Sequence, residues 1–285
     1  MRCRLLALDL DGTLLDEHKR ITPEAYAALR HYRDQGGRVT IATGRFPASA
    51  WLHGKAAGMN APLIALNGAV ILDEQSGELL LGTPLPVSHL LELIRFVEEH
   101  QVYIHLYGYN QLLVKELNEM NVRWPLANVV VSADKELTEA NYQDQIDYIQ
   151  VKPVGDFESF LNKGRAPVYK ATVISENPEL IEELSREISG WGSFTITRTG
   201  RRRFDLNALG VSKRSALEQL CKDILLVRDE VAAIGDYDND IDMLQWAGLG
   251  IAMGNAKEHV KSIAQAVTST NRDNGVAQAV LKYLT

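Results

Sequence analysis

The chain has 285 residues, of which 46% are hydrophobic and 24% are charged, and 30 basic against 37 acidic residues give a net charge of −7. This composition is typical of a globular protein with room for two domains, and the acidic balance argues against a general nucleic-acid or anionic-membrane surface. No stretch approaches the roughly 18 apolar residues of a membrane span, and Cys3 and Cys221 form no CxxC pair, so we expect a soluble, cytoplasmic protein without a disulfide framework.

Strand and helix patterns alternate over the first 83 residues. The apolar run 5–8 predicts a buried strand, and Thr22 followed by Pro23 predicts the start of a helix. Residues 38–42 and 63–66 predict further strands, separated by a helix from about Pro47. This alternation is typical of a parallel α/β sheet. A hairpin is predicted to follow on the same core, over 69–72 and 78–81.

The pattern changes at Thr83-Pro84-Leu85-Pro86, where two prolines mark a boundary. The next segment predicts helices and short strands without strict alternation, at 88–100, 102–107, 112–115, 146–152, 157–161, 168–174, 178–188, 193–197 and 203–207. Alternation then resumes with elements at 212–221, 231–234, 238–246, 250–253, 256–264, 266–267 and 276–284. The sequence therefore predicts one α/β domain from 1–83 and 209–285, with a second α/β domain, 84–208, inserted into it.

The first strand leads directly into Asp9-Leu10-Asp11-Gly12-Thr13. In an extended chain Asp9 and Asp11, at i and i+2, project from the same side. Like charges aimed at one point are costly unless a cation or a proton lies between them. An ordinary Asp-Gly turn is the alternative interpretation of this loop.

Two further groups of polar residues fall at a predicted strand end and a predicted helix start. In Thr43-Gly44-Arg45 the hydroxyl can donate to a phosphate oxygen and the glycine lets backbone N–H groups approach it; a loop with an exposed arginine is the alternative. Lys213 follows the predicted cap Ser212, so it lies in the first turn of a helix, where a cation opposes the helix dipole. Such a lysine is better placed if it faces an anion, although a solvated lysine remains open.

The segment 235–242 carries four carboxylates within seven residues, on Asp236, Asp238, Asp240 and Asp242. A helix-capping role for Asp238 and a solvated Asp242 would explain two of them, and the others indicate a metal. The spacing fits neither an EF-hand, nor a Walker A loop, nor G-x-G-x-x-G, and the histidines form no zinc-binding pair. Oxygen-only ligands favour Mg²⁺.

These groups together suit phosphoryl transfer through an aspartyl-phosphate. Asp9 would attack phosphorus, and Mg²⁺ with Lys213 would offset the charge that builds up there. Asp11 would protonate the leaving oxygen and later deprotonate the water that breaks the aspartyl ester.

The same motifs, in this order, resemble those of the haloacid dehalogenase-like superfamily of phosphatases, in its Cof-like type IIB branch. Asn67-Gly68 and Gly254-Asn255-Ala256 also match that branch. The resemblance implies a Rossmann-like parallel-sheet core, with 84–208 as an inserted α/β cap of the C2B type. It implies that Mg²⁺ is held by Asp9, the backbone carbonyl of Asp11 and Asp236, with Asp240 supporting the site. It also implies a set of phosphate-binding residues, namely Leu10, Gly12, Thr43, Gly44, Lys213 and Asn239. The candidates for contact with the rest of the substrate are Arg45, Asn67, Arg203 and Asp205.

The chain departs from the branch at two positions near the expected junction of cap and core. Arg214 stands where glycine is usual, and Asp205 stands where glutamate is usual. The expected function is Mg²⁺-dependent hydrolysis of small phosphorylated metabolites, such as sugar phosphates, by a monomer or small homo-oligomer without nucleic-acid or membrane partners. A phosphomutase of the same superfamily is the alternative, and a phosphorylatable receiver-like signalling module is an alternative from another class.

Overall fold

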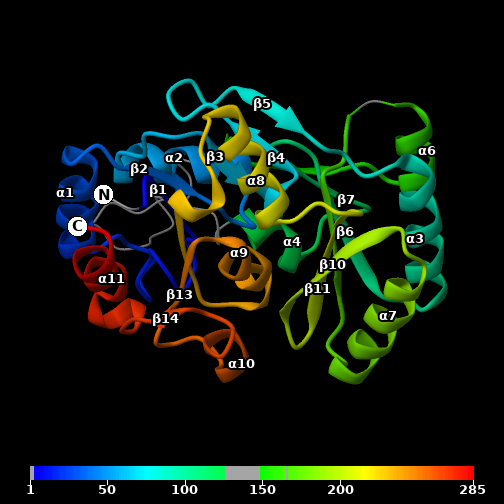
Figure 1. The fold of residues 1–285 in the computed structure, drawn as a ribbon. Helices are drawn as coiled ribbons and strands as arrows, with labels where there is room; N and C mark the ends of the chain where they lie inside the picture. The colour runs from blue at the N-terminus through cyan, green and yellow to red at the C-terminus, as the bar shows by residue number, and fades with distance from the viewer. Residues whose placement is uncertain (1–2, 126–147, 165) are drawn as a thin grey trace.

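The computed structural model describes residues 3–125, 148–164 and 166–285. Within these residues two large β-sheets stand apart, each with its own helices, and a smaller sheet lies beside the first (Figure 1). The chain passes from the first group to the second after β5 and returns after β11, so the N- and C-terminal parts of the chain lie together.

The first sheet is parallel and has the strand order β14-β13-β12-β1-β2. Its strands are β1 (Leu5–Leu8), β2 (Arg38–Ile41), β12 (Val231–Gly235), β13 (Leu249–Ala252) and β14 (Ala266–Val267). Leu5 of β1 lies opposite Val231 on one side and Arg38 on the other. The predicted parallel α/β core is therefore confirmed, with β1 paired on its two sides to segments more than 190 residues apart in the chain (38 and 231).

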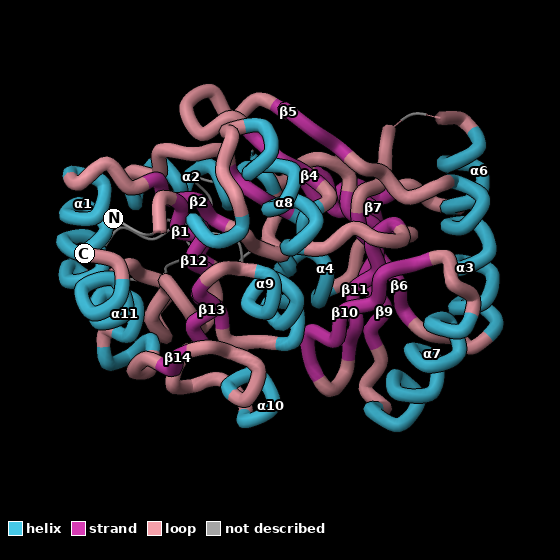
Figure 2. Tube along the Cα trace, viewed as in Figure 1, coloured by secondary structure: helices cyan, strands magenta, loops and turns pink. Residues whose placement is uncertain are grey.

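Strand β1 is buried on both faces, as its unbroken apolar run predicts. Leu6 and Leu8 belong to one hydrophobic cluster, and Leu5 and Ala7 to another. Helices cover both faces of the sheet (Figure 2); they are α1 (Pro23–Asp34), α2 (Pro47–Ala57), α8 (Lys213–Asp223), α9 (Ile241–Trp246), α10 (Glu258–Lys261) and α11 (Gly275–Tyr283). Because each face has its own core, the loops at the strand ends are the part of the sheet left for a ligand.

The third predicted strand lies beside the parallel sheet but belongs mainly to another. Strand β3 (Leu63–Ala65) touches β2 through one parallel bridge, between Ala42 and Ile64. Its ladder is antiparallel, to β4 (Val70–Leu72), which pairs with β5 (Leu79–Gly82). A tight turn after β3, with Asn67 at φ 58° and Gly68 at φ 101°, sends the chain straight back as a hairpin and explains the difference.

The second large sheet has the order β10-β11-β9-β6-β7-β8. Its strands are β6 (Tyr103–Tyr107), β7 (Gln111–Val114), β8 (Gln150–Pro153), β9 (Lys170–Ile174), β10 (Phe194–Gly200) and β11 (Arg203–Ala208). Helices α3 (Val87–Glu99), α6 (Phe157–Asn162) and α7 (Pro178–Gly190) lie along its outer face, and α4 (Glu119–Arg123) lies on the side of the first sheet (Figure 2). The predicted strand at 146–152 falls partly outside the described residues.

Two predicted helices are shorter than expected. The helix expected at 238–246 is a 3₁₀ turn, Asp238–Asp240, followed by α9, and the helix expected at 256–264 is reduced to α10. The start of α1 agrees with its prediction, because the Thr22 side chain accepts a hydrogen bond from the Ala25 N–H. Cys3 and Cys221 are both buried, and no disulfide joins them. In the described ranges no helix is long and apolar enough to cross a membrane.

Candidate active site

The loop after β1 separates the two aspartates of the first motif. Asp9 is buried, and its Oδ1 atom lies 2.6 Å from Lys213 Nζ. Asp11 turns to other cations: Arg45 donates to both of its carboxylate oxygens, each at 2.7 Å, and Lys19 Nζ lies 2.5 Å from Oδ1. The two carboxylates therefore have different cationic partners, and the chain leaves the extended conformation after Asp9 and turns at Gly12 (φ 79°).

Two carboxylates of the loop after β12 converge beside Asp9. Oxygen atoms of Asp9, Asp236 and Asp240 lie within 4.8 Å of one another. Asp240 is fully buried, and its Oδ2 atom accepts hydrogen bonds from the Asp236 and Tyr237 N–H groups at 3.0 and 3.1 Å. This contact with the preceding backbone holds the loop after β12 in place, so the two predicted metal residues of that loop meet the first motif.

Lys213 supplies a cation to this cluster from the start of α8. The Ser212 side chain accepts from the Ser215 N–H and so caps the helix, and the fully buried Lys213 donates to Asp9 Oδ1 and, at 2.7 Å, to Asp240 Oδ1. The prediction that this lysine faces an anion is confirmed. The exposed Arg214 points elsewhere, donating to Glu218 at 2.6 Å, so its departure from the family pattern lies outside the site.

The charges of the cluster do not balance. Burial raises the pKa of Asp9 well above its usual range, by more than the Lys213 ammonium lowers it, and burial with the neighbouring Asp240 raises the pKa of Asp236 to about 7. Burial alone would lower the pKa of Lys213, but Asp240 and Asp9 outweigh it and raise that pKa. A divalent cation among these carboxylates would relieve their repulsion, and an all-oxygen donor set fits Mg²⁺.

Gly12 has two reasons to be glycine. Its φ of 79° is in the left-handed region, and a Cβ atom there would overlap the Asp236 carboxylate. Asp236 accepts from Thr13 Oγ1 at 3.3 Å and from Asn255 Nδ2 at 3.2 Å, and the same Asn255 amide donates to the Gly12 carbonyl at 2.9 Å. The glycine thus lets the first and last motifs pack in direct contact.

The loop after β2 lies between the first motif and the second sheet. Thr43 is buried, and its Oγ1 accepts from the Arg45 N–H at 3.2 Å. The Gly44 carbonyl accepts from Lys170 Nζ of β9 at 2.9 Å. Arg45, expected as a contact for an anionic substrate group, is instead paired with Asp11, and its Nη1 lies 3.4 Å from Ser49 Oγ.

Asp205 joins the second sheet to the first. Its Oδ2 accepts from Asn67 Nδ2 at 3.1 Å and from Lys170 Nζ at 2.9 Å, and its Oδ1 accepts from Thr172 Oγ1 at 2.7 Å. Asn67 Oδ1 in turn accepts from Asn239 Nδ2 at 3.3 Å. Burial alone would raise the pKa of Asp205, but Lys170 and Thr172 outweigh it and lower that pKa.

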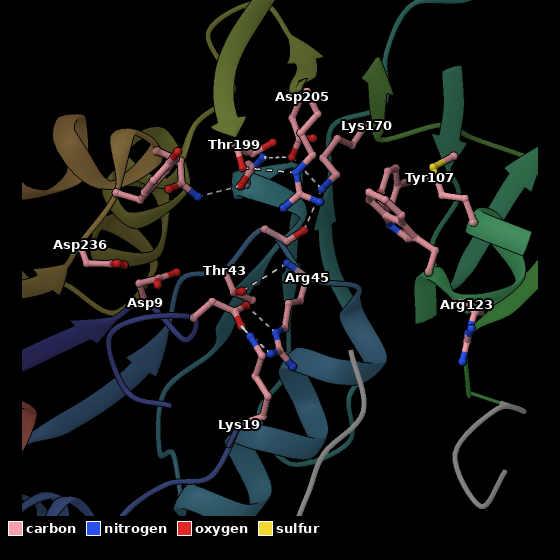
Figure 3. A pocket seen from close by; sticks show the side chains of 18 residues that line it. Asp9, Lys19, Thr43, Arg45, Tyr107, Arg123, Lys170, Thr199, Asp205 and Asp236 are labelled. Carbon is pink, nitrogen blue, oxygen red and sulfur yellow. Dashed lines mark hydrogen bonds and ion pairs between the residues drawn. The ribbon is translucent and has the colours of Figure 1, made fainter. Parts of the chain in front are cut away.

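A cavity of about 480 Å³ lies between these groups (Figure 3). Most of the predicted site residues line it, namely Asp9, Asp11, Thr43, Gly44, Arg45, Asn67, Arg203, Asp205, Asp236 and Asn239. Lys213 and Asp240 are buried behind Asp9, and Leu10 is buried in the core. Arg203 lines the cavity, whereas its neighbour Arg202 pairs with Glu176.

The remaining lining residues were not predicted: Lys19, Tyr107, Met120, Arg123, Trp124, Lys170, Thr199 and Tyr237. Figure 3 shows Asp9 and Asp236 at one end of the cavity and Tyr107 and Arg123 at the other. Lys170 had a detectable signal, since it is a lysine at the start of an apolar strand. The sequence gives no such signal for the aromatic residues, because they reach the site only through the packing of the second large sheet against the first.

Comparison with known proteins identifies the family. The model of the haloacid dehalogenase-like hydrolases matches residues 6–280. Phosphatase YwpJ of Bacillus subtilis is 31% identical, over 99% of each chain, and pyridoxal phosphate phosphatase YbhA of Escherichia coli is 27% identical, over the full length of both.

Solved structures agree with this assignment. A haloacid dehalogenase-like hydrolase from B. subtilis superposes with a TM-score of 0.83 at 28% identity, covering 99% of this chain and 100% of its own. The subclass IIB sugar phosphatase BT4131, at 24% identity and a TM-score of 0.77 over 98% of each chain, shares the fold. The chain therefore belongs to the haloacid dehalogenase-like hydrolases, with the Rossmann-like core and cap of that family, and is a phosphatase that acts on small phosphorylated substrates.

Proposed function

We propose that the chain is a Mg²⁺-dependent phosphatase that works through an aspartyl-phosphate on Asp9. The observation that carries the proposal is the position of Lys213 Nζ, which bridges Asp9 and Asp240 at 2.6 and 2.7 Å in a cluster with Asp236. A buried carboxylate beside a buried ammonium and a site for a second cation is an arrangement in which an anion can attack an anionic phosphate.

In the proposed first step, a carboxylate oxygen of Asp9 attacks phosphorus and the bond to the leaving oxygen breaks. Asp11 donates a proton to that oxygen. In the second step Asp11, now ionised, takes a proton from the water that attacks the aspartyl-phosphate, and inorganic phosphate leaves. Bound by Asp9, the Asp11 backbone carbonyl, Asp236 and Asp240, Mg²⁺ would supply the charge that offsets Asp9 and the phosphate.

Two cations favour the ionised form of Asp11. Burial alone would raise its pKa, but the Arg45 guanidinium and the Lys19 ammonium outweigh burial and hold that pKa well below its usual range. Proton donation therefore requires that substrate binding loosen these ion pairs. Thr43, Lys213 and Asn239, with backbone N–H groups of Leu10, Gly12 and Gly44, are the proposed phosphate ligands.

We also propose the domain division 1–83 with 209–285 as catalytic core, and 84–208 as cap. Two observations support it. The strands of the first large sheet all lie within 1–83 and 209–285, and those of the second large sheet all lie within 84–208. The cavity has walls from both, so a cap that moves relative to the core would open and close the site.

Turnover of acetyl phosphate, a small substrate that any accessible site of this kind can admit, tests the proposal. We expect hydrolysis that needs Mg²⁺ and is lost on chelation, and we expect Asp9→Asn to be inactive while Asp34→Asn, a change at an exposed residue of α1, keeps wild-type turnover. Activity retained by Asp9→Asn or in excess chelator would refute the mechanism. Release of free phosphate, rather than isomerised sugar phosphate from a sugar substrate, separates a phosphatase from a phosphomutase.

A further inference from the structure

The end of the cavity opposite the aspartate cluster is both aromatic and cationic (Figure 3). Trp124 is fixed there because its Nε1 donates to Tyr107 Oη at 2.8 Å. Arg203 Cζ lies 5.4 Å from the centroid of the Trp124 ring, and Lys170 Nζ lies 4.1 Å from the centroid of the Tyr107 ring. Each of the two rings therefore has a cationic side chain over its face.

The other carboxylates that line the cavity, those of Asp205 and Asp11, are already engaged. Both oxygens of Asp205 accept hydrogen bonds from protein donors, and both oxygens of Asp11 do the same. A hydroxyl both donates and accepts hydrogen bonds. To donate to one of these carboxylates, a hydroxyl of a sugar leaving group would have to displace a protein donor. Such an exchange gains little, because one hydrogen bond replaces another.

Donors, in contrast, remain available. Arg203 Nε donates to the Thr199 carbonyl at 3.3 Å, and among the described residues no group accepts a hydrogen bond from its Nη atoms. Thr199 Oγ1 is buried on the cavity wall and has no partner in the described part of the chain. A buried polar atom without a partner costs free energy unless a ligand or water satisfies it.

These contacts define the chemistry of a matching ligand. A guanidinium stacks on flat π-systems, and the Arg203 guanidinium lies over the Trp124 ring with Cζ 5.4 Å from its centroid, so a planar ring can pack against either group. Ring nitrogens, carbonyl oxygens or a carboxylate on that ring would accept from Arg203 and from the Thr199 hydroxyl. The ester phosphate would lie at the aspartate end.

We propose that this subsite, formed by Tyr107, Trp124, Thr199 and Arg203, binds a flat aromatic leaving group that carries hydrogen-bond acceptors. A phosphorylated heteroaromatic compound is then the preferred substrate class, and a polyhydroxylated sugar phosphate is the poorer one. This inference rests on the phosphatase function proposed above.

The experiment compares kcat/KM for pyridoxal 5′-phosphate, glucose 6-phosphate and acetyl phosphate. We expect the wild-type enzyme to prefer pyridoxal 5′-phosphate over glucose 6-phosphate by at least about tenfold, since removal of one stacking partner of a flat ring typically costs that much or more. Trp124→Leu should lose most of this preference. Trp191→Leu is the matched control, because Trp191 is also half-buried in the cap but packs on Phe96, away from the cavity.

Variants of Arg203 serve if Trp124→Leu does not fold, because Arg203 is exposed and can be changed at little cost to stability. Arg203→Met and Arg203→Lys should both lose the preference, since lysine keeps the charge but not the plane. An Arg203→Lys enzyme that keeps the full preference, or a wild-type enzyme that prefers glucose 6-phosphate, would overturn the subsite. Failure to hydrolyse even acetyl phosphate would instead refute the proposed function.

Discussion

Arg45 donates to both carboxylate oxygens of Asp11, from Nε and from Nη2, each at 2.7 Å. The pair joins the loop after β1 to the loop after β2, and Arg45 is buried whereas the Asp11 side chain is 44% exposed at the cavity. A planar guanidinium that binds a carboxylate through two parallel hydrogen bonds fixes its orientation as well as its charge. Arg45 is therefore a positioning residue for the proposed acid and base.

Replacing Arg45 should affect substrates according to their leaving groups. Proton donation by Asp11 matters for an alkyl phosphate and hardly for an aryl phosphate, whose leaving oxygen is a weak base. Arg45→Met would raise the pKa of Asp11, which favours its proton-donating form, but it would also remove the two hydrogen bonds that orient the carboxyl group. We expect the loss of orientation to dominate, so that kcat/KM falls by about 10²-fold for glycerol phosphate, the scale of general acid catalysis, and much less for p-nitrophenyl phosphate. Arg30→Met, at an exposed arginine of α1, is the control. Equal losses on both substrates would indicate that Arg45 binds phosphate instead.

Removing the Lys213 ammonium should harm both stability and turnover. Lys213→Met leaves the buried Asp9 and Asp240 carboxylates without their cation, and breaking a buried ion pair in this way costs about 3–5 kcal/mol. We expect the free energy of unfolding in urea to fall by that amount, and acetyl phosphate hydrolysis to be lost. Lys222→Met, at an exposed lysine of the same helix, should change neither. A Lys213→Met enzyme of wild-type stability would mean that the carboxylates are protonated in the free protein.

The sequence predicted the core motifs well because their spacing and their elements are local. Asp9 and Asp236 follow buried apolar strands, and neighbouring parallel strands bring their carboxyl ends together. The partner of Arg45 was not predictable, since the turn at Gly12, and not the i, i+2 spacing, directs Asp11. Trp124 reaches the cavity through the pairing of distant cap strands, for which a single sequence gives no register.

Acid should destabilise the protein in part through His105. Burial lowers the pKa of His105 to about 3, below the value of about 6.5 for an unfolded histidine. Between those values the unfolded chain binds a proton that the folded chain does not, so stability is lost as the pH falls below about 6.5, by up to about 1.4 kcal/mol per pH unit. Replacing His105 should therefore make the free energy of unfolding depend less steeply on pH.

The measurement is urea unfolding at pH 7 and pH 5. We expect the loss of stability between these two values to be smaller by about 2 kcal/mol in His105→Phe than in the wild-type protein. His31→Phe, at an exposed histidine of α1, should keep the wild-type dependence. If His105→Phe and His31→Phe lost stability equally, His105 would be protonated in the folded protein.

Alanine substitutions at Gly12 and Gly36 can separate the effect of backbone strain from the effect of the close contact between Gly12 and Asp236. Both have φ in the left-handed region, at 79° and 89°, but a Cβ at Gly12 would overlap the Asp236 carboxylate, whereas a Cβ at Gly36 would meet nothing within 4 Å. An alanine at either position should cost about 1–2 kcal/mol of stability from the backbone alone. Gly12→Ala should in addition displace Asp236 and raise the Mg²⁺ concentration needed for half-maximal hydrolysis of acetyl phosphate.

Titration of activity with Mg²⁺ checks this prediction, with the free energy of unfolding measured in parallel. Gly36→Ala should lose stability but keep the wild-type Mg²⁺ dependence, because its site is open and lies at the end of α1. A Gly12→Ala enzyme with an unchanged Mg²⁺ requirement would show that Asp236 is not held against the first motif for the sake of the metal. Loss of Mg²⁺ affinity confined to Gly12→Ala would instead connect the glycine of the first motif directly to the carboxylate of the last.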